Sequence, residues 1–321
     1  MLRGETAGDA ARATRALAGL RRYQEAPRRP PPEPPAAVAT RLGASLRDYG
    51  GDGVPALFVP SLINPPSILD LEGRSLLAWL AGRGRVRPLL VDWGWDVAAR
   101  AGLSVAGHVE AVLLPLIEAA GGEPPLVGYC LGGTMAFGAA ARRRVKGVAA
   151  IAAPWRFSAF PEPSRAMLAG LWEGSKGLAE RLGALPMEVL QAAFWSLDPA
   201  RTVAKFEAFA LAPEDKAEAF VTLEDWANDG PPLPLAAARE LFEGLFGRDE
   251  TGRGQWLAAD PCALACPVLE IVSTVDRIVP AASAAGAGTR IELALGHVGM
   301  MVGGRARDAL WEPLEDWLSG L

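Results

Sequence analysis

The stretch PLVGYCLGGTMAFGAAARRR, residues 125–144, carries the strongest local evidence for a fold in this chain. It opens with an apolar run typical of a buried strand, passes through a glycine-rich turn and continues as a helix of small residues. Cys130 lies at the turn, with Gly128 and Gly132 two residues away on either side. Small neighbours are needed there because a nucleophile on a sharp strand-to-helix turn brings two backbones close together. The segment therefore predicts a nucleophilic Cys130.

A plainer interpretation treats Cys130 as a buried small hydrophobic residue beside a glycine-rich packing point. The pattern G-x-C-x-G is weak by itself, but the strand before it and the helix after it favour the nucleophile. Such a helix directs its N-terminus at the thiol, which stabilises the thiolate. It also presents the backbone N–H of Leu131 to a negatively charged oxygen.

Apolar runs that look like strands buried on both faces recur outward from this segment, and helical patterns separate them. Two such helical patterns are SLLAWLAGRG and AGHVEAVLLPLIEAAGG, the second ending in a Gly-Gly pair typical of a helix C-terminus. Alternating strands and helices predict an α/β fold with a mainly parallel central sheet and helices on both faces. The expected strands lie at 55–60, 87–94, 125–130, 146–154 and 266–276, with a further one at 290–295.

The alternation stops over 156–246, where every pattern is helical and eight of the ten phenylalanines occur. This stretch contains no histidine and no cysteine, so it can line an apolar site but supplies no imidazole or thiolate. We expect it to be a helical cap inserted into a core formed by 45–155 and 247–321. Residues 1–44 are expected to be a tail, an arginine-rich helix followed by the proline-rich linker RRPPPEPPAA. The tail fits either a solvated arm or a segment that docks on a partner protein or an acidic surface.

Composition excludes several classes of protein. The 321 residues include 32 basic and 37 acidic ones, and a net charge of −5 gives no electrostatic footprint for nucleic acid. Three cysteines are too few for a disulfide scaffold and predict a reducing, cytoplasmic compartment. The start MLRGETAGDA has no apolar secretory signal. The uncharged stretch 124–141 contains Pro-Pro and several glycines, which suit a buried strand and turn better than a transmembrane segment.

A thiol nucleophile needs an imidazole within reach, and the chain has only two histidines. His297 follows a late strand and is flanked by glycines, so it is the better candidate for the base. His108 lies inside a helical pattern and is expected to be a structural residue. Asp276 ends the apolar strand of PVLEIVSTVDRIVP and is the candidate to orient His297, although it also fits a turn former or a helix N-cap. The chain order Cys, Asp, His matches a known arrangement of such triads.

Two other segments complete the expected site. The loop VPSLINPPSILDL places the backbone N–H of Leu62 or Ile63 as a second oxyanion donor beside that of Leu131, unless it is an ordinary proline-rich turn. Cys262 and Cys266 have no other cysteine or histidine near them in sequence, so they predict buried free thiols and no metal site. No glycine-rich dinucleotide fingerprint or P-loop occurs.

Several segments together resemble the polyhydroxyalkanoate synthases. GYCLGGTMAFGAAA resembles their lipase-like box, and the upstream stretch that begins LINPPSILDL and ends VDWGWD resembles the segment preceding it. STVDRIVP and LGHVGMMVGG resemble their aspartate and histidine motifs, and FVTLEDWANDGPPLP resembles their tryptophan motif. The match runs from about residue 50 to the C-terminus, and the short chain is closest to the class III catalytic subunit.

The resemblance implies an α/β-hydrolase core in which Cys130 carries the acyl group, His297 is the base and Asp276 its partner. It implies substrate contacts from Trp226 and Asn228 in the tryptophan motif. The expected reaction joins hydroxyacyl-coenzyme A units into a polyester such as poly(3-hydroxybutyrate) and releases coenzyme A, with no cofactor or metal beyond the coenzyme A thioester. The expected location is the cytoplasm or the surface of a polyester granule. Whether a second synthase subunit or a homodimer is required stays open.

Two departures and two alternatives qualify this hypothesis. The family usually has histidine directly after the aspartate, where this chain has Arg277, and the tryptophan motif is only loosely kept. A thioesterase or intracellular polyester depolymerase would use the same three residues with water as acceptor. A silent binding protein at the granule surface is disfavoured because Cys130, Asp276 and His297 are all present. A cysteine favours acyl transfer, since exchange between two thioesters is nearly isoenergetic.

Overall fold

The computed structural model describes residues 2–321, apart from the side chain of Asp215. Its centre is a sheet of eight strands in the order β1-β2-β6-β3-β7-β8-β11-β12. The pairs from β6 to β12 are parallel, whereas β2 runs antiparallel to β6 and β1 antiparallel to β2. The strands are β1 (Ala37–Arg41), β2 (Ala44–Asp48), β3 (Val54–Val59), β6 (Val86–Asp92), β7 (Leu126–Tyr129), β8 (Val148–Ile151), β11 (Val268–Ser273) and β12 (Thr289–Leu293).

All six expected strands are present, but the two antiparallel strands β1 and β2 at one end of the sheet were not expected. β1 is exposed along most of its length and β2 is only partly buried, so neither is the continuous apolar run that indicates a strand buried on both faces. The sheet begins at Ala37, and the expected boundary between tail and core at 44/45 is therefore wrong.

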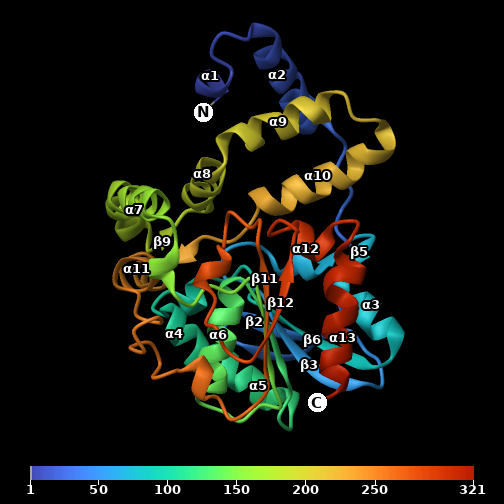
Figure 1. Ribbon diagram of the computed structural model, residues 1–321, viewed down its shortest axis with the longest axis vertical. Coiled ribbons are helices and arrows are strands. Elements are labelled where there is room, and N and C mark those ends of the chain that lie inside the picture. Colours follow the sequence, from blue (N-terminus) through green and yellow to red (C-terminus); the bar gives the residue numbers. More distant parts are fainter. Residues whose placement is uncertain (1) are drawn as a thin grey trace.

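Helices cover both faces of the sheet (Figure 1). One face packs against α4 (Val105–His108), η3 (Val109–Leu113), α5 (Leu114–Ala120) and α6 (Leu131–Ala140). The other packs against α3 (Leu76–Arg83), α12 (Gly299–Val302), η8 (Arg307–Trp311) and α13 (Glu312–Ser319). Between the two apolar clusters on these faces, β7, β8 and β11 are buried along their whole length. None of the described helices combines the length and apolar character needed to cross a membrane.

A helical cap lies over the end of the sheet where the parallel strands terminate (Figure 1). Its long helices are α7 (Glu162–Leu182), α8 (Met187–Leu197), α9 (Pro199–Ala210) and α10 (Glu214–Asn228). Beside them lie the short pair β9 (Ala184–Leu185) and β10 (Leu233–Pro234), then α11 (Leu235–Arg239) and η5 (Glu240–Gly247). The cap therefore sits where side chains that follow the strands would meet a substrate.

The N-terminal segment packs on this cap. It comprises α1 (Leu2–Glu5), α2 (Ala10–Glu25) and the proline-rich stretch to residue 36, and we call it the arm. In Figure 1, α2 lies against α9 at the far end of the cap from the sheet. Gly19 contacts the backbone of Phe206 so closely that a Cβ there would lie 1.8 Å from the Phe206 carbonyl oxygen. The arm is thus not freely solvated: it docks on the cap, where its arginines pair with Glu207, Asp225 and Glu218. Its docking on a partner protein stays a prediction.

Candidate active site

Cys130 lies at the sharp turn between β7 and α6. Its backbone has φ 56° and ψ −131°, a region that non-glycine residues rarely adopt and that is often associated with function. The two flanking glycines make the turn sterically feasible. A Cβ on Gly128 would lie 2.3 Å from the Gly133 Cα, and one on Gly132 would lie 2.0 Å from the Val59 carbonyl oxygen. The turn leaves the thiol half-buried at the N-terminus of α6.

His297 and Asp276 are brought together by the loops that follow β12 and β11. The His297 Nδ1 lies 2.6 Å from the Asp276 Oδ2. The other carboxylate oxygen of Asp276 accepts backbone hydrogen bonds from Ile278 at 2.8 Å and Val279 at 3.0 Å. With Nδ1–H donating to the carboxylate, the imidazole presents Nε2 to the same cavity that Cys130 lines. This is the arrangement in which an oriented imidazole exchanges a proton with a thiol.

The ionisation of His297 depends on its two neighbours. Desolvation by burial lowers the pKa of the imidazole, but the negative charge of Asp276 and the adjacent Cys130 sulfur outweigh it. The net result is a pKa raised above the usual imidazole range. The His297 ring also stacks on Tyr129, with centroids 4.9 Å apart, which holds its plane. The surroundings therefore favour an imidazolium between a carboxylate and a sulfur.

A cavity of about 330 Å³ joins these three residues to the underside of the cap. The walls from α8 and α10 are largely apolar and include Phe194, Trp195 and Trp226. A lining of this kind excludes water and can hold an acyl chain.

Three cations in this cavity were not predicted from the sequence. Lys205 pairs with Glu224 at 2.6 Å, and Arg277 pairs with Asp198 at 2.7 Å. Arg201 lines the cavity without an ion-pair partner among the described residues. The spacing of Arg201 and Lys205, four residues apart on α9, was the available signal, because such residues share one face of a helix.

The two expected oxyanion donors lie in different situations. Leu131 is the first residue of α6, where a backbone N–H has no partner within the helix. Ile63 lines the cavity, but its N–H donates to the Ser61 Oγ at 3.2 Å. Leu62 does not line the cavity. The Leu131 N–H is therefore free to bind an oxyanion. The Ile63 N–H could do so only after its hydrogen bond to Ser61 breaks.

Of the two residues expected to touch substrate, only Trp226 lines the cavity. Its indole Nε1–H donates to the Pro65 carbonyl at 2.9 Å, which fixes the ring. Asn228 lies at the end of α10 and its Oδ1 accepts from the Gln191 Nε2. Asn228 does not itself line the cavity, and its contact with substrate stays a prediction. The tryptophan motif was matched by residue type alone, whereas in the fold the Asn228 side chain points toward α8.

The remaining histidine and cysteines lie outside the site. His108 is buried, its Nδ1 lies 2.8 Å from the Ser104 carbonyl, and desolvation lowers its pKa to about 4. It is thus the neutral structural residue that its helical position indicated. Cys266 is half-buried and Cys262 is exposed, and both are free thiols. The expectation that Cys262 is buried is wrong, because it lies in the short helix η6 (Pro261–Ala263), which buries only Pro261.

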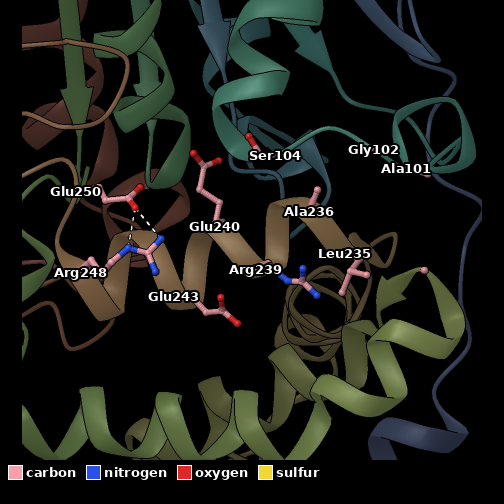
Figure 2. Close-up of a pocket in the computed structure, with 11 residues that line it drawn as sticks. Ala101, Gly102, Ser104, Leu235, Ala236, Arg239, Glu240, Glu243, Arg248 and Glu250 are labelled. Atoms are coloured by element: carbon pink, nitrogen blue, oxygen red, sulfur yellow. Dashed lines mark hydrogen bonds and ion pairs between the residues drawn. The ribbon is translucent and has the colours of Figure 1, made fainter.

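A separate hollow of about 700 Å³ lies where α11 and η5 of the cap meet the core near Ser104 (Figure 2). Its charged groups all have partners: Figure 2 shows Arg248 paired with Glu250, at 2.7 Å. Arg239 pairs with Glu180 and Glu243 with Lys176, both outside the hollow. Glu240 accepts from the Trp256 indole and from the Ala106 backbone N–H. None of Cys130, Asp276 and His297 lines this hollow. Its polar contacts join the cap to the core.

Comparison with known proteins adds a family relationship to this geometry. No protein-family model matches the chain. A poly(3-hydroxyalkanoate) polymerase subunit of Haloferax mediterranei is 26% identical over 83% of this chain and 58% of its own length. The chain is similar to poly(3-hydroxyalkanoate) polymerase subunits. Those of Haloarcula marismortui and Allochromatium vinosum are 25% and 27% identical, with 64% and 81% of their own lengths covered. The chain thus spans under two thirds of the Haloferax and Haloarcula proteins, and the family resemblance is confirmed.

Solved structures establish the fold class. A monoacylglycerol lipase of Paleococcus ferrophilus has a TM-score of 0.52 at 16% identity, covering 86% of this chain and 98% of its own. A metagenome-derived lipolytic enzyme also has a TM-score of 0.52 at 17% identity, covering 88% of this chain and 100% of its own. These are α/β-hydrolases, and the expected fold class is confirmed.

Proposed function

We propose that this protein is an acyltransferase that polymerises hydroxyacyl-coenzyme A into a polyhydroxyalkanoate. The observation that carries the proposal is the convergence of Cys130, His297 and Asp276 at the floor of a cavity closed by an apolar cap. The similarity to poly(3-hydroxyalkanoate) polymerase subunits supports the same substrate class.

The first step would load the acyl group onto Cys130. His297 holds the proton of the Cys130 thiol as an imidazolium, and the Cys130 thiolate attacks the thioester carbonyl carbon. The new carbon–sulfur bond to Cys130 forms as the bond to coenzyme A breaks, and the imidazolium returns its proton to the departing thiolate. The oxygen that becomes negative in between would face the backbone N–H of Leu131, joined by that of Ile63.

The second step would transfer the acyl group to an alcohol. The hydroxyl at the end of a growing chain, or of a second hydroxyacyl thioester, gives its proton to His297 and attacks the acyl-Cys130 carbonyl. An ester bond forms, the thioester to Cys130 breaks, and the thiol is regenerated with the proton from the imidazolium. The thioester retains enough reactivity for this transfer, provided that water is kept away. The aromatic residues of the cap, such as Phe194 and Trp226, serve that exclusion.

The assignments of substrate and setting rest on similarity. We expect Trp226 to bound the acyl-binding space, and Arg201, which has no ion-pair partner among the described residues, to face the anionic coenzyme A portion. We expect the protein to act in the cytoplasm at the surface of a polyester granule, with a second subunit or a homodimer as the active form.

The test is to mix the purified protein with a short hydroxyacyl-coenzyme A and to follow thiol release and the acyl product together. We expect thiol release with an insoluble polyester. Release with free hydroxy acid alone would replace the proposal by a cysteine hydrolase with the same three residues.

Matched variants test the assignment of roles. Cys130→Ala should abolish acylation, measured by mass spectrometry of the intact protein. His297→Ala should lower turnover by roughly three orders of magnitude, as loss of an oriented base does. His108→Ala should change it little, because His108 is buried away from the cavity. Equal losses in the two histidine variants would contradict the choice of base.

A further inference from the structure

A second cavity, of about 1110 Å³, lies beneath the arm. The arm between residues 18 and 34 forms its roof, α10 with the end of α9 forms one side, and residues near Tyr49, Asp70 and Trp95 form the floor. It is more than three times the volume of the catalytic cavity. Nothing in the acyl-transfer steps above uses it.

The two cavities share a wall. Pro65 and Trp226 line both of them, and the hydrogen bond from the Trp226 Nε1 to the Pro65 carbonyl, at 2.9 Å, closes that wall. Pro65 and Trp226 therefore lie between the space above Cys130 and the larger space under the arm. Rotation of the Trp226 ring, at the loss of one hydrogen bond, would connect them.

The arm holds the element that carries Trp226. Asp225, the preceding residue, accepts from the Tyr23 hydroxyl at 2.6 Å and from Arg28 at 3.1 Å. Arg29 pairs with Glu218 at 2.7 Å on the same helix. The arm thus closes the second cavity and also positions the wall between the two.

The charges around the two cavities differ. Each of the three carboxylates of the catalytic cavity pairs with a cation or with His297, and Arg201 is in excess. Around the second cavity, eight carboxylates face five guanidinium groups. The lining also contains apolar surface from Val221, Phe209, several prolines and the 61%-exposed Trp95. An acidic and partly apolar space disfavours a polyphosphate such as coenzyme A and suits a neutral chain of esters.

We propose that the second cavity receives the growing polyester as it leaves Cys130 past Trp226. The inference rests on the proposed polymerase function. The anionic end of the thioester would remain on the side of Arg201, and the neutral product would move to the other side of the shared wall. The arm is then the roof of a product compartment, and the compartment controls how far a chain grows before release.

Filling the cavity tests this inference. Ala217 is a half-buried residue of α10 that lines the second cavity and not the catalytic one. Ala217→Trp should shorten the polyester several-fold, measured by size-exclusion chromatography of the extracted polymer, while Cys130 still becomes acylated. The matched control is Ala169→Trp, at an exposed alanine of the cap helix α7 that lines neither cavity. It should leave the chain length as in the parent protein.

Thr222→Trp, one turn along α10 and also lining the second cavity, guards against misfolding of the first variant. Unchanged chain length in a folded Ala217→Trp or Thr222→Trp variant would overturn the inference. So would loss of Cys130 acylation in both, because the cavity would then serve the acylation step. A parent protein that releases thiol but makes no polyester would instead refute the proposed function, and the inference would fail with it.

Discussion

Asp276 performs two tasks for His297 at the scale of single residues. Its carboxylate selects the tautomer of the imidazole, and its charge opposes the desolvation that lowers the imidazole pKa. Two backbone N–H groups hold the same carboxylate in place, so the pair is preorganised before substrate arrives. Both tasks can be tested by removing the charge and keeping the shape.

Asp276→Asn should lower stability in a pH-dependent way. Folding raises the pKa of His297, so the charged pair contributes stability that is complete below the unfolded imidazole value of about 6.5. That contribution is lost as pH rises through the higher folded value. The deficit of the variant, measured as the free energy of unfolding in urea, should therefore be larger at about pH 6 than at about pH 10. An equal deficit at both pH values would show that folded His297 is neutral throughout.

Close backbone contact between α2 and α9 explains, at the scale of elements, why the arm stays on the cap. Gly19 faces the Phe206 carbonyl with no room for a side chain. Arg12 pairs with Glu207 at 2.8 Å farther along the same two helices. The contact at Gly19 sets how closely the helices approach, and the partly buried Arg12–Glu207 pair adds to it.

Gly19→Ala should release the arm. Its Cβ would overlap backbone, which cannot move like a flexible side chain, and the expected cost to arm docking is roughly 1–3 kcal/mol. The measurement is trypsin cleavage at the arginines of α2, which should become faster. Gly4→Ala is the control within the same arm, because nothing lies within 4 Å of that position. Equal cleavage rates for the two variants would contradict the close contact.

The cap is joined to the catalytic loops at the scale of the whole molecule. Arg277 directly follows Asp276 and pairs with Asp198, whose side chain also caps α9 by accepting from the Arg201 backbone N–H. Arg277, which stands where the family usually has histidine, thus connects the loop of Asp276 to the cap helix α9. If Cys130 carries an acyl group as proposed, we expect this connection to influence whether water or an alcohol reaches it.

Arg277→Gln should loosen this connection and admit water. Because the Arg277 side chain is 68% exposed, we expect a change in partition of the acyl group and little loss of stability. The ratio of free hydroxy acid to polyester should rise roughly two- to fivefold, as for loss of about 0.5–1 kcal/mol of cap closure. Arg290→Gln, which breaks a pair on the surface of β12, is the control. The same product ratio in both variants would contradict the role of Arg277.

Local sequence was sufficient for the elements buried on both faces of the sheet and for the turn at Cys130. An apolar run needs no partner to be recognised, and a cysteine between two glycines after such a run predicts a strand-to-helix turn. Strands β1 and β2 were not predicted, because their residues are partly exposed and do not form an apolar run. The order Cys130, Asp276, His297 pointed to a site, since side chains that follow parallel strands meet at one edge of the sheet.

Tertiary structure alone decided what surrounds that site. The Asn228 side chain contacts Gln191, and Arg201 and Lys205 line the cavity, because the packing of the cap sets which face of each helix points inward. Arg277 lines the cavity from the loop after β11. The sequence did not predict that the arm docks on the cap, since the residues that pair across this contact lie some two hundred positions apart. Contacts between distant segments depend on the path of the whole chain, whereas strands and turns depend on neighbours. Sequence therefore determined the sheet core and the candidate site residues, and only the fold determined how the cap and the arm pack and which cavities they enclose.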